Sequence, residues 1–520
     1  MRRARALILI PKTPGFTRIL NGRLFQKCFA ALLAIPVLAA SIGAAPPKAP
    51  KISQIYVTAE TATTVEVVWN TTTAADSLLQ YSTINPVPAQ ATQIYLASQA
   101  TLHEIPLVTL TPGTTFFYKV TSCNKRGCSS ATGSFETFPS CPDVVPAVSG
   151  SWQRAASSNV GATSNNQLFG VAAVSESDVW AVGWAQDPIG PSYVKRTLIQ
   201  HFNGSSWSIV QSPTPANDID SKLYGVAGLS ANDVWAVGSS HNGALPSRTL
   251  IQHWNGIQWS NVPSPSPDSQ FNELRGVVAL AHDNVWAVGY RGGSKRDTPI
   301  ETLILHWDGS SWRVIESPNI GGSANQLFGI SVIAANDIWA VGSVSGAPLS
   351  IHWDGNAWNV VPTNIRDGLS TGKLNAVSGN ASNDVWAVGE GKGIYTNQTF
   401  ATIMHWDGTR WTEKTCRAAS STNPPDDYEG TGTDAYLTGV AAASANDVWA
   451  VGVRGAGPMI LHWDGTAWTT VTHPRAFPDA AVLRAVTTSR GGRAWSVGLE
   501  VEISSTTVSN ERTLIDTYSP

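Results

Sequence analysis

The chain has 520 residues, of which 42% are hydrophobic and 14% are charged. This length exceeds what one ordinary hydrophobic core supports, so we expect at least two domains. The 45 glycines and 31 prolines indicate many turns and exclude an architecture built from long helices.

The N-terminal segment has the features of a secretory signal peptide. Seven basic residues and no acidic residue occur in the first 27 positions, and the apolar run "CFAALLAIPVLAASIGAA" (28–45) ends in small residues. We expect cleavage near Ala44 or Ala45, so that residues 1–45 are removed from a secreted or cell-surface protein. The alternative is an uncleaved leader, which would be the chain's one link to a membrane.

The charge balance argues against one class of partner. Removing the seven basic residues of the leader from the total of 34 leaves 27 against 37 acidic residues, a net charge near −10. An acidic surface repels phosphate backbones, so we do not expect nucleic acid as a partner.

Residues 46–140 predict a β-sandwich. Seven short segments with alternating polar and apolar residues lie between turn signals, and Trp69 is expected to be buried between two sheets. The stretch "LTPGTTFFYKV" (110–120) resembles the tyrosine-corner region of fibronectin type III domains, with Phe116 in place of the family's tyrosine. The stretch "TTVEVVWNTTTAADSLLQYST" (63–83) resembles the sandwich that precedes the catalytic part of purple acid phosphatases.

The second resemblance implies a cluster of Asp, Asn and His metal ligands downstream, and the sequence contains no such cluster. We therefore interpret the sandwich as a spacer or an adhesion module, joined by a linker over 141–150 to the rest of the chain.

Four cysteines follow the leader. Cys123 and Cys128 flank "NKRG", which is typical of a hairpin tip, and we predict a disulfide between them in an oxidising compartment. Cys141 and Cys416 have no neighbouring partner, and a long-range bridge between them stays open. No His lies at ligand spacing from the first pair, so we do not expect a zinc site there. We also predict no cofactor for the chain.

From residue 151 onward the sequence consists of seven repeated units. Each has a leucine, a tryptophan twelve residues later and a glycine three residues after that, whereas the spacing between units varies from 46 to 63 residues. Such a fixed interior with variable connections is typical of repeated β modules. The units start at Leu168, Leu223, Leu274, Leu327, Leu374, Leu437 and Leu483.

Each unit predicts four strands, with an Asn-Gly or Asp-Gly hairpin signal between the third and fourth. The last unit ends after its third strand, and an unassigned strand-like segment, 150–158, stands before the first unit. The sequence therefore predicts an all-β chain whose residues 151–520 form a seven-bladed β-propeller of four-stranded blades. The strand around Trp152 completes the last blade and closes the ring. The repeated tryptophans are expected to fill the wedges between blades.

Four-stranded blades with spaced Trp or Tyr resemble kelch and galactose-oxidase-like propellers and other bacterial secreted propeller repeats. The paired glycines of kelch repeats and a recognisable set of copper ligands are absent from the sequence. The Asp-box of sialidase-type propellers is not matched in spacing either. The resemblance thus implies a fold and no particular chemistry.

A polar pair recurs in six units. An Asp or Asn precedes the second-strand "VW" and a His occupies the third strand, whereas the seventh unit has Arg493 and Thr517 at these places. The start of one antiparallel strand lies beside the end of the next, so we expect these pairs to be hydrogen-bonded, as in the Asp–His tie of WD-repeat propellers. Six copies around a ring cannot converge on one substrate, so we interpret them as structural. The pairs are Asp178 with His201, Asp233 with His253, Asn284 with His306, Asp337 with His352, Asp384 with His405, and Asp447 with His462.

Recognition is expected on one face of the ring. Loops between second and third strands and loops between blades share this face and vary in length and composition. Aromatic rings there are candidates to stack on a sugar or to anchor a protein, with simple covering of the blades as the alternative. The candidates are Trp184, Tyr193, Tyr290, Tyr395 and Tyr428.

Common catalytic motifs are absent from the sequence, including a nucleophile elbow, HExxH and a Gly-rich phosphate loop. The sequence therefore favours a non-catalytic binding or adhesion protein that recognises an extracellular glycan or protein. A structural envelope protein is one alternative. Another is a polysaccharide hydrolase or lyase that uses loop carboxylates, for which the candidates are Asp187, Asp297, Asp426, Asp427 and Glu429.

Overall fold

The computed structural model of the chain is all-β. The predicted signal peptide (1–45), the predicted linker (141–150), Cys141 and Cys416 lie outside the residues that it describes. Within the described residues there is no helix long and apolar enough to cross a membrane. The described residues are 48–59, 63–137, 151–161, 164–186, 194–215, 217–243, 246–293, 299–321, 324–363, 369–393, 399–415, 434–473, 480–505 and 508–520.

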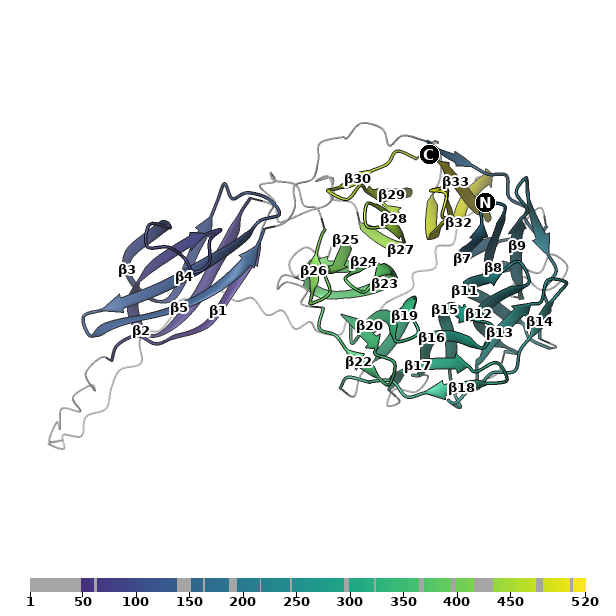
Figure 1. Cartoon of the computed structure of the whole chain (residues 1–520), viewed down its shortest axis with the longest axis horizontal. Coiled ribbons are helices and arrows are strands. Elements are labelled where there is room, and N and C mark those ends of the chain that lie inside the picture. The colour runs from purple at the N-terminus through teal and green to yellow at the C-terminus, as the bar shows by residue number, and fades with distance from the viewer. Residues whose placement is uncertain are drawn as a thin grey trace, which may run out of the picture. The chain divides into compact units, whose positions relative to one another are not determined.

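Five strands form the N-terminal β-domain (Figure 1). They pair in the order β1-β2-β4-β5, and β3 also pairs with β2. We predicted seven strands, and the number is corrected because two pairs of predicted segments each continue as one long strand. The β2–β3 pairing passes through register shifts between Asn70 and Ser77, where the sequence resembles a turn. The strands are β1 (Ile52–Ala59), β2 (Val65–Ser82), β3 (Thr92–Leu107), β4 (Thr115–Asn124) and β5 (Gly127–Glu136).

Trp69 lies in the core of this domain, as predicted, and is fully buried. Its indole N–H donates to Ser122 Oγ at 2.9 Å, which ties β2 to β4. Its ring stacks on His103 of β3 at 4.9 Å with nearly parallel planes. The imidazole of His103 is in turn hydrogen-bonded to Thr71 Oγ1 at 2.9 Å and to Ser77 Oγ at 2.6 Å. The polar atoms around this tryptophan are therefore paired inside an apolar core.

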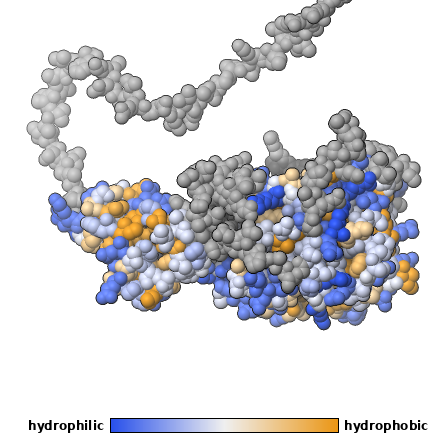
Figure 2. All heavy atoms as spheres, turned by 90° about the horizontal axis from the view of Figure 1, so that it is seen from above, coloured by the Kyte–Doolittle hydropathy of each residue, from blue (hydrophilic) through white to orange (hydrophobic). Residues whose placement is uncertain are grey.

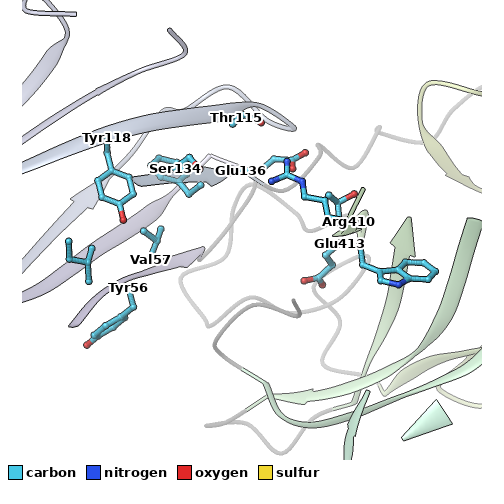
Figure 3. Close-up of a pocket in the computed structure, with 12 residues that line it drawn as sticks. Tyr56, Val57, Thr115, Tyr118, Ser134, Glu136, Arg410 and Glu413 are labelled. Carbon is cyan, nitrogen blue, oxygen red and sulfur yellow. The ribbon is translucent and has the colours of Figure 1, made fainter. Parts of the chain in front are cut away.

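Strands β1, β4 and β5 carry Tyr56, Val57, Tyr118 and Ser134 (Figure 3). Tyr118 is buried, and a Cβ at Gly133 of β5 would lie 2.4 Å from its hydroxyl oxygen, so a larger residue there would require the Tyr118 ring to move. Apolar side chains also gather on part of the outer surface of this domain (Figure 2).

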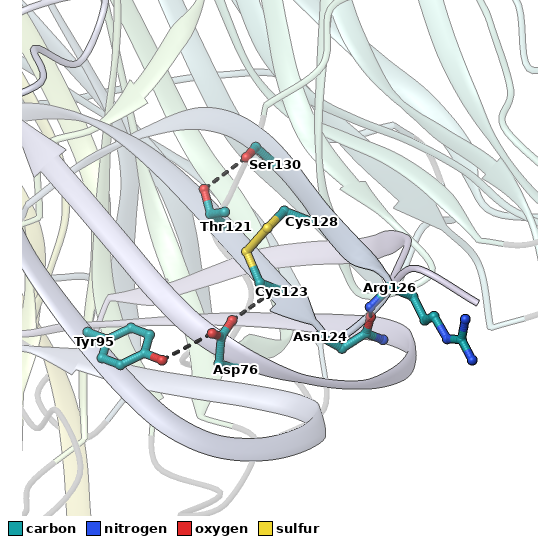
Figure 4. The surroundings of a disulfide bond; sticks show 8 residues. All are labelled: Asp76, Tyr95, Thr121, Cys123, Asn124, Arg126, Cys128 and Ser130. Carbon is teal, nitrogen blue, oxygen red and sulfur yellow. Dashed lines mark hydrogen bonds between the residues drawn. A yellow bond between two sulfur atoms is a disulfide. The ribbon is translucent and has the colours of Figure 1, made fainter. Parts of the chain in front are cut away.

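The predicted disulfide between Cys123 and Cys128 is present (Figure 4). The two residues are directly opposite each other in β4 and β5, next to the turn that joins these strands. Asp76 of β2 accepts hydrogen bonds from the backbone N–H of Cys123 at 2.6 Å and from the hydroxyl of Tyr95 at 3.1 Å. The disulfide therefore closes a hairpin that is also held by β2.

The remaining strands form seven four-stranded antiparallel blades around a ring (Figure 1). The first two blades are joined by one parallel pair, Asp220 with Lys195. The inner strands are β7 (Asn166–Ser175), β11 (Asp220–Ser230), β15 (Asn272–Ala281), β19 (Asn325–Ala334), β23 (Leu369–Ala381), β27 (Ala435–Ser444) and β31 (Ala481–Thr488). The second strands are β8 (Asp178–Gln186), β12 (Asp233–His241), β16 (Asn284–Gly292), β20 (Asp337–Val344), β24 (Asp384–Gly393), β28 (Asp447–Arg454) and β32 (Ala494–Ser505).

Each blade continues outward through a third and a short fourth strand. The third strands are β9 (Lys195–Phe202), β13 (Arg248–Trp254), β17 (Ile300–Trp307), β21 (Ala347–Trp353), β25 (Thr399–Trp406), β29 (Gly457–Trp463) and β33 (Val508–Ser519). The fourth strands are β10 (Trp207–Val210), β14 (Trp259–Asn261), β18 (Trp312–Ile315), β22 (Trp358–Val360), β26 (Trp411–Glu413), β30 (Trp468–Thr470) and, for the last blade, β6 (Ser151–Arg154). In the fifth blade, Arg410 precedes β26 and Glu413 ends it (Figure 3).

The ring is closed by β6, which confirms the prediction from the two unassigned ends of the repeat array. Trp152 pairs with Tyr518 of β33. The indole of Trp152 is 2% exposed and packs edge-on against Trp449 of the sixth blade at 5.3 Å. The guanidinium of Arg154 forms a bidentate ion pair with Glu500 of β32. The strand that completes the last blade is thus held by hydrogen bonds, by aromatic packing and by charge.

The second-strand tryptophans fill the wedges between blades. Trp339 is 2% exposed and lies against Trp406 at 4.9 Å and Trp411 at 5.3 Å, both in the following blade. On its other side it contacts His352 of its own blade at 4.4 Å. The same position is at most 5% exposed in all seven blades. Such burial of large aromatic rings accounts for seven of the chain's 21 tryptophans.

Candidate functional site

Every inner strand carries a β-bulge at the same place. In the first blade, Leu168 pairs with Gly183 and Gly170 pairs with Val182, so Phe169 has no partner in the second strand. The same register shift follows the repeated leucine in the other six blades. A bulge re-aims the side chain of its extra residue, and here the extra residue faces the centre of the ring.

The repeated glycine makes room for this bulge. A Cβ at Gly238 would lie 1.9 Å from the carbonyl oxygen of Lys222, and the six equivalent glycines give distances from 1.8 to 2.0 Å. No other residue fits there without moving the inner strand. The repeated Leu, Trp and Gly are therefore the frame of a blade, and the glycine is the part of the frame that permits the bulge.

Neighbouring inner strands approach each other closely just beyond the bulge. A Cβ at Gly170 would lie 2.7 Å from the carbonyl oxygen of Tyr224, and a Cβ at Gly329 would lie 2.9 Å from the Cα of Ala376. This backbone-to-backbone packing draws the bulged residues of the seven blades into one small space.

That space is a cavity of about 400 Å³. It is lined by one bulged residue from each blade, namely Phe169, Tyr224, Arg275, Phe328, Asn375, Thr438 and Arg484. Lys373 and Tyr436, each directly before a repeated leucine, and Glu390 of β24 complete the lining. These residues lie at the beginning of the inner strands, which is the side of the ring that the loops between blades enter.

Along four consecutive inner strands of the cavity, two adjacent aromatic rings lie between two cations. The guanidinium of Arg484 lies over the ring of Phe169 at 4.8 Å. Phe169 meets Tyr224 edge-on at 5.2 Å, and the guanidinium of Arg275 lies over the Tyr224 ring at 4.1 Å. Each cation therefore rests on the face of a neighbouring ring, where the negative π surface attracts it.

The charge of Arg275 is compensated by an acid from its own strand. Its guanidinium forms an ion pair with Glu273 at 2.5 Å and donates to the hydroxyl of Tyr290 at 3.3 Å. That hydroxyl donates to Glu273 at 2.9 Å. Burial by itself would lower the pKa of Arg275, but Glu273 and the two nearby tyrosines outweigh it and the pKa is raised. Burial also raises the pKa of Tyr224 and of Tyr290.

Arg484 stands in a different setting. Within the described part of the chain it forms no ion pair and no hydrogen bond, and its Nε is buried. Burial lowers its pKa, and Tyr436 and Glu511 oppose this effect. A guanidinium stays protonated in any protein environment, so Arg484 brings to the cavity a positive charge that is not neutralised by an ion pair within the described residues.

The six predicted polar pairs are hydrogen-bonded. In each, the His Nε2 lies 2.8 to 2.9 Å from an Oδ1 of Asp or Asn. In four blades the same oxygen also accepts from the second-strand tryptophan, as Asp233 does from Trp235 at 2.8 Å. The acids begin the second strands, at the end opposite to the cavity, and none of them lines it.

Two of the five aromatic candidates lie in strands, which corrects their predicted place on loops. Trp184 pairs with Thr197 inside the first blade and is 6% exposed, with the ammonium of Lys195 at 4.6 Å from its ring centre. Tyr290 belongs to β16 and supports Arg275 as described above. The second strands continue for several residues past the repeated glycine, which the loop-like sequence there conceals. The other three, Tyr193, Tyr395 and Tyr428, lie outside the described residues.

None of the seven bulged residues was predicted from the sequence as a candidate. One sequence feature could have identified them. In every unit, one residue lies between the repeated leucine and a small Gly or Ala, and its type varies along the chain as Phe, Tyr, Arg, Phe, Asn, Thr and Arg. The residue type at this position changes from unit to unit, whereas the residues on either side of it change little. This pattern indicates that the position serves a role other than packing of the blade.

Among the described residues there is no group of three or more His, Cys, Asp or Glu side chains placed to hold a metal ion. The loop carboxylates considered for a hydrolase or lyase, Asp187, Asp297, Asp426, Asp427 and Glu429, all lie outside the described residues.

Comparisons with known proteins bear on the N-terminal domain. The family described as "Purple acid Phosphatase, N-terminal domain" matches residues 50–137, in agreement with the resemblance seen in the sequence. A comparison of the sequence with curated proteins finds no match. The match covers only this domain, and the resemblance of the repeats to kelch propellers stays a prediction.

Solved structures similar to this chain include three proteins of low identity. A family 117 glycoside hydrolase of the marine bacterium Zobellia galactanivorans has a TM-score of 0.31 and 6% identity, covering 71% of this chain and 90% of that chain. A subtype N11 neuraminidase-like protein of A/flat-faced bat/Peru (H18N11) has a TM-score of 0.33 and 10% identity, covering 71% and 94%. A GH74 xyloglucanase of Xanthomonas campestris has a TM-score of 0.24 and 12% identity, covering 88% and 72%. At these TM-scores the likeness carries no functional information.

Proposed function

We propose that this protein is an extracellular, non-catalytic binding protein that takes a glycan in the central cavity of its propeller. The observation that carries the proposal is the ring of bulged side chains. Three of the seven are aromatic, Phe169, Tyr224 and Phe328, and Tyr436 adds a fourth ring to the lining. Aromatic faces bind the C–H faces of sugars, while the polar and charged groups among them can orient sugar hydroxyls.

The size of the cavity supports a small ligand over a protein surface. About 400 Å³ falls in the range of ordinary small-molecule sites and suits a short stretch of sugar rings. A protein partner would need a wide contact area, which a cavity of this volume does not supply.

The small number of carboxylates in the cavity lining supports binding of a glycan without its hydrolysis. Glycoside hydrolysis uses a pair of carboxyl groups on either side of the scissile bond. Among the described lining residues Glu390 is the single carboxylate, and it is ion-paired with Lys373 at 3.4 Å. A hydrolase or lyase would therefore have to draw its acids from outside the described residues.

The proposed location rests on two features. The Cys123–Cys128 disulfide is typical of proteins in an oxidising compartment. The predicted signal peptide would deliver the chain there. In this arrangement the sandwich serves as the spacer or adhesion module that we expected from its sequence.

A glycan array probed with the purified protein tests the proposal. We expect saturable binding, at least about tenfold weaker in Tyr224→Ala and Phe328→Ala, and no reducing sugar released over time. Tyr56→Ala is the matched control, since Tyr56 is a half-exposed aromatic residue of the sandwich. Time-dependent release of reducing sugar would favour the hydrolase, and absence of binding to any glycan would favour a structural protein.

A further inference from the structure

The lining of the cavity has more positive than negative charge. Three cations face it, Arg275, Lys373 and Arg484, against the single carboxylate of Glu390. Two of the cations have an acidic partner, because Arg275 is paired with Glu273 at 2.5 Å and Lys373 with Glu390 at 3.4 Å. The third cation has none within the described residues, so the excess charge is located at Arg484.

Arg484 is held in place without using its donors. Its guanidinium lies over the ring of Phe169 at 4.8 Å. Glu511, an acid whose charge acts on it, accepts instead a hydrogen bond from Gln167 Nε2 at 2.6 Å. The packing positions the guanidinium, while its terminal N–H groups stay available to a ligand. A buried cation with unused donors is costly unless a partner of opposite charge arrives.

We infer that this cavity selects acidic glycans, and that Arg484 binds the carboxylate of a uronic-acid sugar. The inference rests on the proposed function and names its ligand class. The planar guanidinium presents two parallel N–H groups that match the two oxygens of a carboxylate.

The surroundings of Arg484 favour a sugar as the carrier of this carboxylate. Tyr436 lines the same cavity from the neighbouring inner strand, β27. The two strands are tied together at this point, because Thr438 Oγ1 donates to the carbonyl oxygen of Leu483 at 2.7 Å. A pyranose ring stacked on Tyr436 would therefore have the guanidinium of the next strand beside it. The aromatic face supplies the affinity for the ring, and the guanidinium discriminates the acid from the neutral sugar.

Isothermal titration calorimetry with matched sugars tests the inference. The ligands are oligogalacturonate and oligoglucuronate, each beside its carboxyl-reduced form of equal length, which keeps the ring and loses the charge. We expect each acid to bind at least about tenfold more tightly than its reduced form, and this difference to shrink as salt is added.

Variants of the full chain assign the effect to Arg484. Arg484→Met keeps an unbranched stem and should abolish the preference for the acid. Arg484→Lys keeps the positive charge but lacks the two parallel N–H groups of the guanidinium, so it should lose most of the preference for the acid. Arg313→Met is the matched control, since Arg313 lies on the outer strand β18 with a side chain 70% exposed. Melting temperatures show whether each variant is still folded. If a variant does not fold, the comparison of acid with reduced sugar on the unaltered protein still tests the inference.

The outcomes separate this inference from the proposed function. Equal affinity for acid and reduced sugars would overturn the inference and leave glycan binding standing. An acid preference that persists in Arg484→Met would also overturn it, because another group would then hold the carboxylate. Absence of binding to these sugars, with other glycans bound on the array, would overturn the inference alone, and a blank array would overturn both.

Discussion

The guanidinium of Arg484, in the last blade, lies over the ring of Phe169, in the first blade, at 4.8 Å. Both are bulged residues of inner strands, and they become neighbours because the ring is closed by the pairing of β6 with β33. The contact therefore joins the two ends of the repeat array inside the cavity where we propose that a ligand binds. Formation of this part of the site therefore depends on closure of the ring.

Trp152→Ala should weaken this closure. The indole is buried against Trp449 and Tyr518, so its loss is expected to reduce the free energy of unfolding by about 3–5 kcal/mol. Hydrogen exchange should show faster exchange of the β33 amides. Trp358→Ala is the control, because it removes the equivalent tryptophan from a blade that needs no distant strand. A loss of protection in β33 that is the same in both variants would contradict the prediction.

Gly238→Ala should destabilise the second blade. The new Cβ would lie 1.9 Å from the carbonyl oxygen of Lys222, so the inner strand must move and the bulge must change. We expect a loss of about 1–3 kcal/mol or more in the free energy of unfolding, measured by denaturant titration. Gly457→Ala is the matched control, because the nearest atom to a Cβ there, the Arg454 carbonyl oxygen, is 3.9 Å away. Equal stability of the two variants would contradict this prediction, because it would show that the inner strand β11 can move at no cost in free energy.

Asp233→Ala should cost stability and leave ligand binding intact. The carboxylate accepts hydrogen bonds from Trp235 Nε1 at 2.8 Å and pairs with His253 Nε2 at 2.9 Å, and both groups would lose their partner. We expect a loss of about 1–3 kcal/mol in unfolding free energy. Asp233→Asn should cost less, because Asn284 fills the same role in the third blade. Loss of glycan binding without a lower melting temperature would contradict the structural role.

Stability should fall as the solution is acidified from about pH 8 to about pH 5. Burial lowers the pKa of His405 below its ordinary value of 6.5, although the bond to Asp384 opposes this. The folded protein therefore takes up this proton less readily than the unfolded chain does. The stabilising contribution is complete well above pH 6.5 and is lost as the pH drops from that ordinary value towards the lower pKa of the folded protein.

Urea titrations across this pH range measure the effect. His405→Gln should reduce the pH dependence, and His306→Gln should act in the same direction, since burial also lowers the pKa of His306. A free energy of unfolding that rises on acidification, or variants that keep the full pH dependence, would refute this assignment.

Much of the fold could be predicted because its signals are local and repeated. The constant offsets from Leu374 to Trp386 to Gly389, repeated in every unit, define a blade without knowledge of its neighbours. The unmatched ends at Trp152 and Tyr518 predict the closure of the ring, because a four-stranded sheet missing one strand needs that strand from elsewhere. The polar pairs were also predictable from local signals. Each pair joins two neighbouring antiparallel strands of one blade, so the strand pairing places the two side chains close together.

The lengths of several strands could not be predicted, because they depend on pairing with other strands and not on the local sequence pattern. The stretch around Asn70 resembles a turn, yet β2 continues through it because β3 pairs along both sides. Trp184 and Tyr290 lie past the repeated glycine in loop-like sequence, yet the third strands extend the pairing to them.

The sequence by itself determined the number of blades, their strand order and the residue types at their wedges, because these follow from hydrophobic periodicity and turn chemistry within about 50 residues. Only the tertiary structure decided which side chains share the central cavity. A bulge exists only relative to a partner strand, and Phe169 and Arg484 meet only when all seven blades have closed into a ring.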